Sequence, residues 1–210
     1  MIGSEAEAQN YIAQHWGAQA LENCRTFVSA LQSENERQNL VSRRSLDEVW
    51  VRHVADSAQL LHYAPANCGN WIDIGTGAGF PGLVIALLRP DLQTMLVEPR
   101  RLRVEWLQGI RDSFNLINCS IMMTRAEKLP SVNYDVISAR AVAGLEDLLQ
   151  MTERLAGAGT RWIFSKGRNA EEELRHLPKR LTRHRVFHVK HSLTASDARI
   201  MVCELAKDQG

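Results

Sequence analysis

The chain has 210 residues, of which 45% are hydrophobic and 23% are charged, and its formal net charge is +1. This composition favours one compact unit and excludes a mostly disordered chain, a collagen-like repeat and a disulfide-rich miniprotein. No apolar run approaches the roughly 18 to 20 residues of a membrane span. The acidic N-terminus has neither the basic nor the apolar region of a secretion signal. We therefore expect a cytoplasmic protein.

The cysteines are widely separated, and none forms a CxxC pair. They are Cys24, Cys68, Cys119 and Cys203. A metal or redox site of the CxxC type is therefore not expected, and free thiols in a reducing compartment are.

The N-terminal part of the chain has helical patterns. Two capping-box patterns, Ser4-x-x-Glu7 and Ser45-x-x-Glu48, predict helix starts. Another helix is predicted over about 18–33, and apolar residues after Ser45 recur at helical spacing.

The pattern changes after a break at Pro65, so we predict an N-terminal helical region, 1–66, packed on a second part, 67–210, in one compact unit. Five apolar runs predict strands, at 71–74, 94–98, 119–123, 134–138 and 160–165. The segments between and after them predict helices, at 81–88, 100–115, 144–156 and 169–177. This alternation predicts an α/β fold with a parallel sheet, and two last runs, 185–193 and 199–206, predict an appended antiparallel hairpin.

A glycine-rich loop follows the first predicted strand and opens a helix. Residues 73–82 read DIGTGAGFPG. The dinucleotide fingerprint would require a third glycine where Phe80 stands, so the loop suits a nucleoside without a pyrophosphate. We predict Gly75 and Gly77 as cofactor-binding residues and the Phe80 ring as a flat contact. Asp73 either contacts the ligand or is a buried carboxylate that accepts hydrogen bonds from loop amides.

More polar candidates follow the later strands. Glu98 ends the second strand and can accept both ribose hydroxyls, or it is a surface acid paired with a neighbouring arginine. Ala126 and Glu127 follow the third strand, where they can contact an adenine ring, although Glu127 also suits a helix N-terminus. Arg140 follows the fourth strand. Because ligands of open α/β sheets bind at the carboxyl ends of the strands, these candidates predict one site.

A third group of candidates surrounds that site. Arg52 and Asp56 are four residues apart on a predicted helix and can form an ion pair. His53 lies beside the apolar stripe, as a packed histidine or a positioning group. Lys166 and Arg168 follow the fifth strand, where we expect contact with phosphate. We expect no metal at this site.

Basic residues gather in two places. Arg100, Arg101 and Arg103 form one cluster, and residues 174–196 contain no acidic residue but six lysines and arginines and four histidines. Such a surface can bind phosphate, or it can be a solvated face.

Several segments resemble the bacterial small-subunit rRNA guanine-N7 methyltransferase family (RsmG, also called GidB). They read DIGTGAGFPG, LVEPRRLRVEWLQ, ISARAVAGL and FSKG, together with NLVS and VRHVADS upstream. The resemblance runs from about residue 25 to the end. It implies a class I S-adenosylmethionine (AdoMet) fold, Rossmann-like, with seven mostly parallel strands and a C-terminal antiparallel hairpin. It also implies methylation of N7 of one guanine in 16S rRNA.

The resemblance carries site residues with it. The positions that match the family's AdoMet site are Gly75, Phe80, Glu98 (for the ribose), Ala126, Glu127 and Arg140. The sequence departs from the family pattern at Pro99, directly after the ribose acid. The implied partner is 16S rRNA or a small-subunit particle, and we expect a monomer that binds neither DNA nor membranes.

Guanine N7 carries a lone pair and no proton, so we predict no catalytic acid or base. Catalysis then depends mainly on placement of the reacting atoms. The positioning candidates are Arg52, His53, Asp56, Arg140 and Lys166, and the RNA-binding candidates are Arg100, Arg101, Arg103, Lys166 and Arg168. Two alternatives stay open: a small-molecule methyltransferase, and a non-catalytic ribosome-assembly factor that binds RNA. A nicotinamide oxidoreductase is disfavoured because Phe80 breaks the fingerprint.

Overall fold

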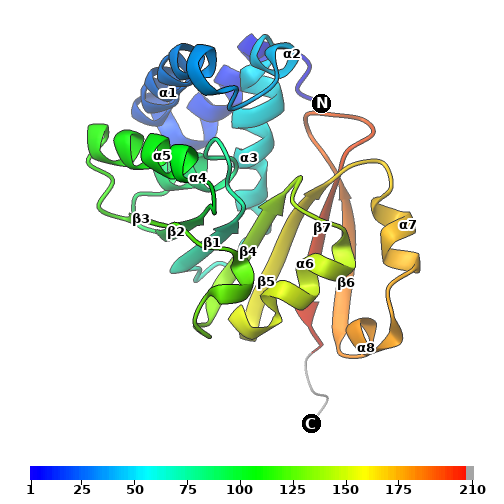
Figure 1. Cartoon of the computed structure of the whole chain (residues 1–210). Helices are drawn as coiled ribbons and strands as arrows, with labels where there is room; N and C mark the ends of the chain where they lie inside the picture. Colours follow the sequence, from blue (N-terminus) through cyan, green and yellow to red (C-terminus); the bar gives the residue numbers. More distant parts are fainter. Residues whose placement is uncertain (207–210) are drawn as a thin grey trace.

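A computed structural model describes residues 1–206 and contains a seven-stranded sheet in the order β3-β2-β1-β4-β5-β7-β6 (Figure 1). The strands are β1 (Asn70–Ile74), β2 (Gln93–Val97), β3 (Cys119–Met122), β4 (Tyr134–Arg140), β5 (Ala156–Lys166), β6 (Arg185–His191) and β7 (Arg199–Leu205). The first five are parallel, whereas β7 pairs antiparallel with both β5 and β6. The predicted fold class, with its parallel strands and C-terminal hairpin, is confirmed.

Helices cover both faces of the sheet, and the core contains three apolar clusters. One joins the N-terminal helices to α4 and α5, a second joins α6, α7 and α8 to the opposite face, and a third includes Trp71 and Ile85. The two faces alternate along each strand: Trp71 packs with Ile85, whereas Ile72 packs with Leu148. The helices of the second part are α4 (Gly82–Leu88), α5 (Arg101–Ser113), α6 (Leu145–Thr152), α7 (Ala170–Arg175) and α8 (Lys179–Thr182), with short helices η3 (Ala126–Lys128) and η4 (Glu153–Leu155).

The N-terminal helices begin as predicted and then depart from the prediction. Ser4 and Glu7 form the capping box of α1 (Glu5–Gln38), whose second part covers the predicted helix 18–33 after a break at Gly17. The prediction of a second capping box, Ser45-x-x-Glu48, is wrong, because Ser42 rather than Ser45 caps the next helix. Glu48 instead forms an ion pair with Arg52 at 2.9 Å. The remaining N-terminal helices are α2 (Arg43–Leu46), η1 (Trp50–Ala55, a π-helix), α3 (Asp56–Ala58) and η2 (Gln59–Tyr63).

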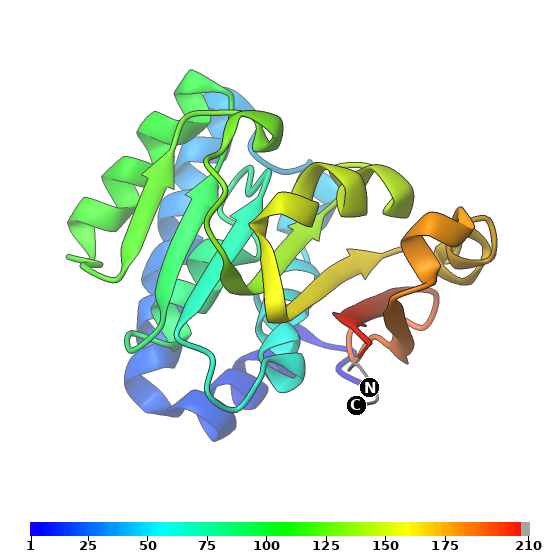
Figure 2. The same ribbon diagram turned by 90° about the horizontal axis from the view of Figure 1, so that it is seen from below.

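The N-terminus returns to the far end of the sheet. The Ile2 amide donates to the Leu193 carbonyl at 2.7 Å, so the first residues lie beside the loop between β6 and β7 (Figure 1). Figure 2 shows that hairpin at the edge of the sheet opposite β3. All four cysteines are free and buried, as expected. No helix within residues 1–206 is long and apolar enough to span a membrane.

Candidate functional site

The carboxyl ends of β1 to β4 surround a cavity of about 660 Å³, which we call the cofactor cavity. Its lining includes six of the predicted site residues, namely Gly75, Glu98, Arg100, Arg103, Ala126 and Glu127. The strand order reverses between β1 and β4, and such a switch point is where open α/β sheets bind ligands. Six of the candidates that the sequence predicted therefore line one cavity.

The glycine loop brings its backbone close to this cavity. Gly75, Gly77 and Gly79 have φ values of 66°, 60° and 110°, which lie in the left-handed region that favours glycine. A side chain at Gly75 would stand 2.7 Å from Val142, and one at Gly77 would stand 3.4 Å from the Arg103 guanidinium. The loop therefore needs glycine both for its conformation and for the space that it leaves.

Glu98 is fixed at the end of β2 by two backbone amides. Its Oε2 accepts from the Gly77 N–H at 3.1 Å, and its Oε1 accepts from the Arg100 N–H at 2.9 Å. The Arg103 guanidinium lies 3.9 Å from Oε2. The residue is 3% exposed but lines the cavity, so its carboxylate points inward rather than to bulk solvent. This arrangement disfavours the surface-acid alternative.

Asp73 is a buried carboxylate and does not line the cavity. One oxygen accepts from the Gly82 N–H at 2.9 Å and the other from the Ser138 hydroxyl at 2.7 Å. The Trp71 indole in turn donates to Ser138. Burial raises the pKa of Asp73 to about 6, although these hydrogen bonds lower it. This arrangement favours the alternative of a buried carboxylate that accepts hydrogen bonds over direct contact with the ligand.

The Phe80 ring also lies away from the cofactor cavity. It is 3% exposed, stacks on the His53 ring at 4.7 Å and packs against Phe27 at 5.5 Å. The ring does not line this cavity, so its predicted flat contact with the nucleoside stays a prediction. The ring instead supports the Arg140 guanidinium, which stands 5.1 Å from its centroid. The ring that stacks on Phe80 comes from η1 and the tilted one from α1, and neither contact could be read from the local sequence.

Arg140 ends β4 and joins the sheet to the N-terminal helices. Its guanidinium donates to the Arg52 carbonyl at 3.0 Å and lies 3.3 Å from the Asp56 carboxylate. The predicted Arg52–Asp56 pair is wrong, because Arg52 pairs with Glu48 and Asp56 pairs with Arg140. Arg140 does not line the cofactor cavity and faces a neighbouring one.

His53 is a neutral partner of Arg140. Its Nδ1 lies 2.8 Å from the Arg140 guanidinium, which only donates, so Nδ1 accepts and the ring proton is on Nε2. Burial and the nearby Arg140 and Arg52 lower the pKa of His53 to about 3. Its Nε2 is buried and has no partner among residues 1–206. The structure therefore makes His53 a group that holds Arg140 rather than one that exchanges protons.

The neighbouring cavity measures about 290 Å³ and lies at the ends of β4 and β5; we call it the β4–β5 cavity. Lys166 lines it, but its ammonium bonds the Glu173 carboxylate at 2.7 Å and the Ala143 carbonyl at 3.0 Å. With a side chain only 9% exposed and paired with Glu173, Lys166 is poorly placed for a phosphate on the surface, and its predicted contact with RNA stays a prediction. Arg168 is 79% exposed and lies 3.5 Å from Asp197.

The other basic candidates lie in two places: at the start of α5, beside the cofactor cavity, and along the stretch 174–196, away from it. Arg100 and Arg101 are exposed at the start of α5, and Arg101 pairs with Glu105 at 2.9 Å. The basic stretch 174–196 runs through α7, α8 and the edge strand β6. Only part of it is free, because Arg180 and Arg185 pair with acidic residues near α6.

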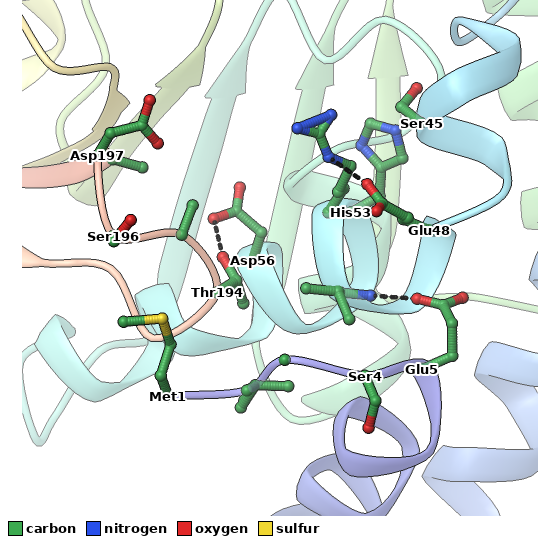
Figure 3. A pocket seen from close by; sticks show the side chains of 16 residues that line it. Met1, Ser4, Glu5, Ser45, Glu48, His53, Asp56, Thr194, Ser196 and Asp197 are labelled. Carbon is green, nitrogen blue, oxygen red and sulfur yellow. Dashed lines mark hydrogen bonds and ion pairs between the residues drawn. The ribbon is translucent and has the colours of Figure 1, made fainter.

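A third cavity, of about 630 Å³, lies between the N-terminus, η1 and the β6–β7 loop (Figure 3). The Glu5 carboxylate there accepts from the Trp50 and Val51 amides, and Asp56 accepts from the Thr194 hydroxyl at 3.0 Å. Sequence reasoning missed these contacts and also Glu173. The only local signal for Glu173 is its place in an acidic first turn of α7, which is common to many helices.

The strand order, with cavities at the carboxyl ends of the parallel strands, is that of the class I methyltransferase fold. Two solved structures share this fold. A ribosomal protein L11 methylase from Lactobacillus delbrueckii subsp. bulgaricus has a TM-score of 0.60 and 12% identity, covering 74% of this chain and 79% of that one. A methyltransferase from Geobacter sulfurreducens has a TM-score of 0.58 and 14% identity, covering 86% and 89%.

The chain belongs to the rRNA small subunit methyltransferase G family, whose model matches residues 20–201. A ribosomal RNA small subunit methyltransferase G from Erythrobacter litoralis is 46% identical over 202 residues, covering 96% of this chain and 97% of the relative. The corresponding protein from Novosphingobium aromaticivorans is 45% identical over 206 residues, covering 96% and 89%. The predictions of this family, of a methyltransferase and of AdoMet as its cofactor are confirmed.

Proposed function

We propose that the protein transfers the methyl group of AdoMet to N7 of one guanine in 16S rRNA. The observation that carries this proposal is the position of Glu98, whose carboxylate faces a nucleoside-sized cavity opposite the glycine loop. Ribose hydroxyls need an acceptor at that point, and the second strand of this fold supplies it.

The residues of the cofactor cavity suit this group. A carboxylate offers about four acceptor positions, and the amides of Gly77 and Arg100 occupy two of those on Glu98. The remaining two can accept the ribose hydroxyls. Apolar lining from Ile74, Val97 and Ala126 suits an adenine ring, with Glu127 at its rim. Gly75 then leaves space for the remaining part of AdoMet. Phe80 and Arg140 lie outside the cavity lining and support its wall.

The transfer requires placement rather than proton exchange. AdoMet supplies a methyl group already activated by its positive sulfur. The N7 lone pair forms the new bond to the methyl carbon, and the carbon–sulfur bond breaks with its electron pair remaining on sulfur. Positive charge passes to the purine, and no proton leaves N7. The neutral, Arg140-bound state of His53 agrees with a site that holds no general base.

On this proposal the substrate is folded rRNA, alone or within a small-subunit particle, and the protein acts as a monomer in the cytoplasm. Exposed arginines near the site, Arg100, Arg101 and Arg168, can contact RNA phosphates. Arg103 is less available because it lies beside Glu98.

The first test is calorimetric binding of AdoMet to the native protein, to Gly77→Val and to Gly159→Val as a control. Gly159 has open space around it, so valine is tolerated there, whereas Gly77 has φ +60° and Arg103 close by. We expect micromolar binding by the native protein and the control, and none by Gly77→Val. Equal binding by all three would contradict the assigned cofactor site.

The second test is transfer of labelled methyl to unmodified small-subunit rRNA, naked and in particles. N7-methylguanine is located by reductive cleavage of the RNA chain at the modified base. Label at N7 of one guanine is the expected result. Absence of label from both substrates, with AdoMet binding intact, would contradict the proposed substrate and favour the assembly-factor alternative.

A further inference from the structure

The β4–β5 cavity adjoins the cofactor cavity without being part of it. Ala141 and Ala143 line both, so one turn of chain after β4 separates the two spaces. Ala141 has φ 55°, a conformation uncommon for any residue other than glycine, which turns the chain sharply at this wall. The lining of the β4–β5 cavity is Asp56, Arg140, Ala141, Ala143, Leu148, Ser165, Lys166, Gly167, Glu173, Ala198 and Arg199.

The charges around this cavity are balanced in pairs. Arg140 lies 3.3 Å from Asp56, and Lys166 lies 2.7 Å from Glu173. The third cation, Arg199, is 2.8 Å from an acidic residue of α7. Each cation of the lining therefore already has a carboxylate, and a phosphate would gain no unpaired partner. A volume of about 290 Å³ is near the lower limit of small-molecule sites, roughly 300 to 1,000 Å³. Both facts favour one neutral ring over a phosphate.

Unused hydrogen-bonding capacity remains on adjoining atoms of this lining. An ammonium has three protons; Lys166 donates one to the Ala143 carbonyl and forms an ion pair with Glu173, so donor capacity remains on its nitrogen. The Glu173 Oε2 also accepts from the Leu145 N–H at 2.6 Å. Within residues 1–206, Glu173 Oε1 has no hydrogen-bond partner, and the buried Ser165 hydroxyl has none either. One donor thus stands next to one free acceptor.

We propose that the β4–β5 cavity receives the target guanine and that the Lys166–Glu173 pair reads its edge; this rests on the function proposed above. Lys166 donates a remaining proton to O6, while the two lone pairs of Glu173 Oε1 accept from N1–H and the 2-amino group. N7 lies on the other side of O6 from N1, so it turns toward Ala141 and the cofactor cavity. Adenine has an amino group at C6 and an unprotonated N1, so it would face donor with donor and acceptor with acceptor.

The same pair favours the transfer itself. Methylation of N7 makes the purine ring positive and makes N1–H a stronger donor. The Glu173 carboxylate is then bonded more strongly after charge has developed than before, which stabilises the transition state more than the bound substrate. A base held alone in a cavity has left its stack, so the RNA must present an extruded guanine.

The test compares Glu173→Gln with the native protein and with Glu172→Gln. Glu172 is an exposed residue of the same helix outside the cavity lining, so it controls for the loss of a negative charge on α7. Small-subunit particles are assembled with guanine, inosine or adenine at the mapped position. Inosine lacks only the 2-amino group, so it removes one of the bonds to Glu173.

For Glu173→Gln on the guanine particle, we expect kcat/KM to fall roughly 10- to 100-fold, the effect of weakening hydrogen bonds to a charged group. The AdoMet affinity should stay unchanged, which also reports that the variant is folded. The native protein and Glu172→Gln should lose about 10-fold on inosine, whereas Glu173→Gln should lose clearly less. Adenine should not be methylated.

Two results would overturn the proposal. One is equal methylation of guanine and inosine particles by the native protein, which needs no variant to fold. The other is the same inosine-to-guanine ratio in Glu173→Gln as in the native protein, since a purely structural role would scale both substrates alike. Failure of the proposed function is different in kind, because then the native protein methylates no particle.

Discussion

The two cavities differ in what forms their walls. At the carboxyl ends of β1 and β2, which we call the first edge, the wall is mainly backbone. At the carboxyl ends of β4 and β5, which we call the second edge, it is mainly side-chain ion pairs. The first edge consists of a glycine loop and one carboxylate fixed by two amides, all within residues 73–100. The second edge joins Asp56, Arg140, Lys166, Glu173 and Arg199, which come from widely separated parts of the chain. The comparison teaches that the proposed cofactor site is built from a motif that is local in the sequence. The surroundings of the proposed substrate base depend on tertiary pairing.

The largest predicted effect comes from a substitution that removes an ion pair of the second edge. Arg140→Met removes the cation that pairs with Asp56 and bonds His53, and we expect the free energy of unfolding to fall by about 3 kcal/mol. Chemical denaturation measures it, with Arg168→Met as a matched control on an exposed side chain. A loss as small as that of the control would mean that the ion pairs do not hold this edge together.

The next effect concerns the first edge, where the titration of Asp73 makes the free energy of unfolding depend on pH. Burial raises the pKa of Asp73 from its ordinary value of 3.8 to about 6 in the folded protein, which therefore holds this proton more tightly than the unfolded chain does. The resulting stabilisation is complete below pH 3.8 and is lost as the pH rises through 6. The difference between the two pKa values corresponds to about 3 kcal/mol.

Asp73→Asn removes this titration, so the native protein should lose up to about 3 kcal/mol relative to the variant between about pH 4 and pH 7.5. Urea denaturation of both proteins at the two pH values gives the difference. A constant difference would show that folding does not raise the pKa of Asp73.

A smaller effect separates the two edges. Glu98→Gln keeps an acceptor for one backbone amide but loses the charge, and we expect AdoMet to bind about 10-fold more weakly. The inosine-to-guanine ratio should not change, because Glu98 does not line the β4–β5 cavity. Calorimetry and methyl transfer measure the two quantities, and a change in the ratio would contradict independent edges.

The smallest effect concerns the surface outside both edges. Arg168 is exposed, so Arg168→Ala should change the free energy of unfolding by less than about 0.5 kcal/mol. RNA binding should weaken for all sequences, and the slope of log affinity against log salt should fall by about 1. Titrations at several salt concentrations measure this slope, and an unchanged slope would remove Arg168 from the RNA contacts.

The sequence could predict the local features of the molecule. Strands and helices of the second part follow from apolar periodicity, and the loop 73–82 follows from glycine spacing between a strand and a helix. Glu98 could be found because its place at the end of the second strand is set by chain order alone. The family resemblance rests on the same local segments, which is why it was visible without the structure.

Only the tertiary structure decided which side chains pair. Arg52 pairs with Glu48 rather than Asp56, Phe80 packs against α1, and Lys166 is neutralised by Glu173. Each outcome depends on how side chains are placed in the folded chain, and spacing along the sequence does not fix that placement. Charge and burial act through space, so a local pattern can name a group of candidates but not the partner that each one finds.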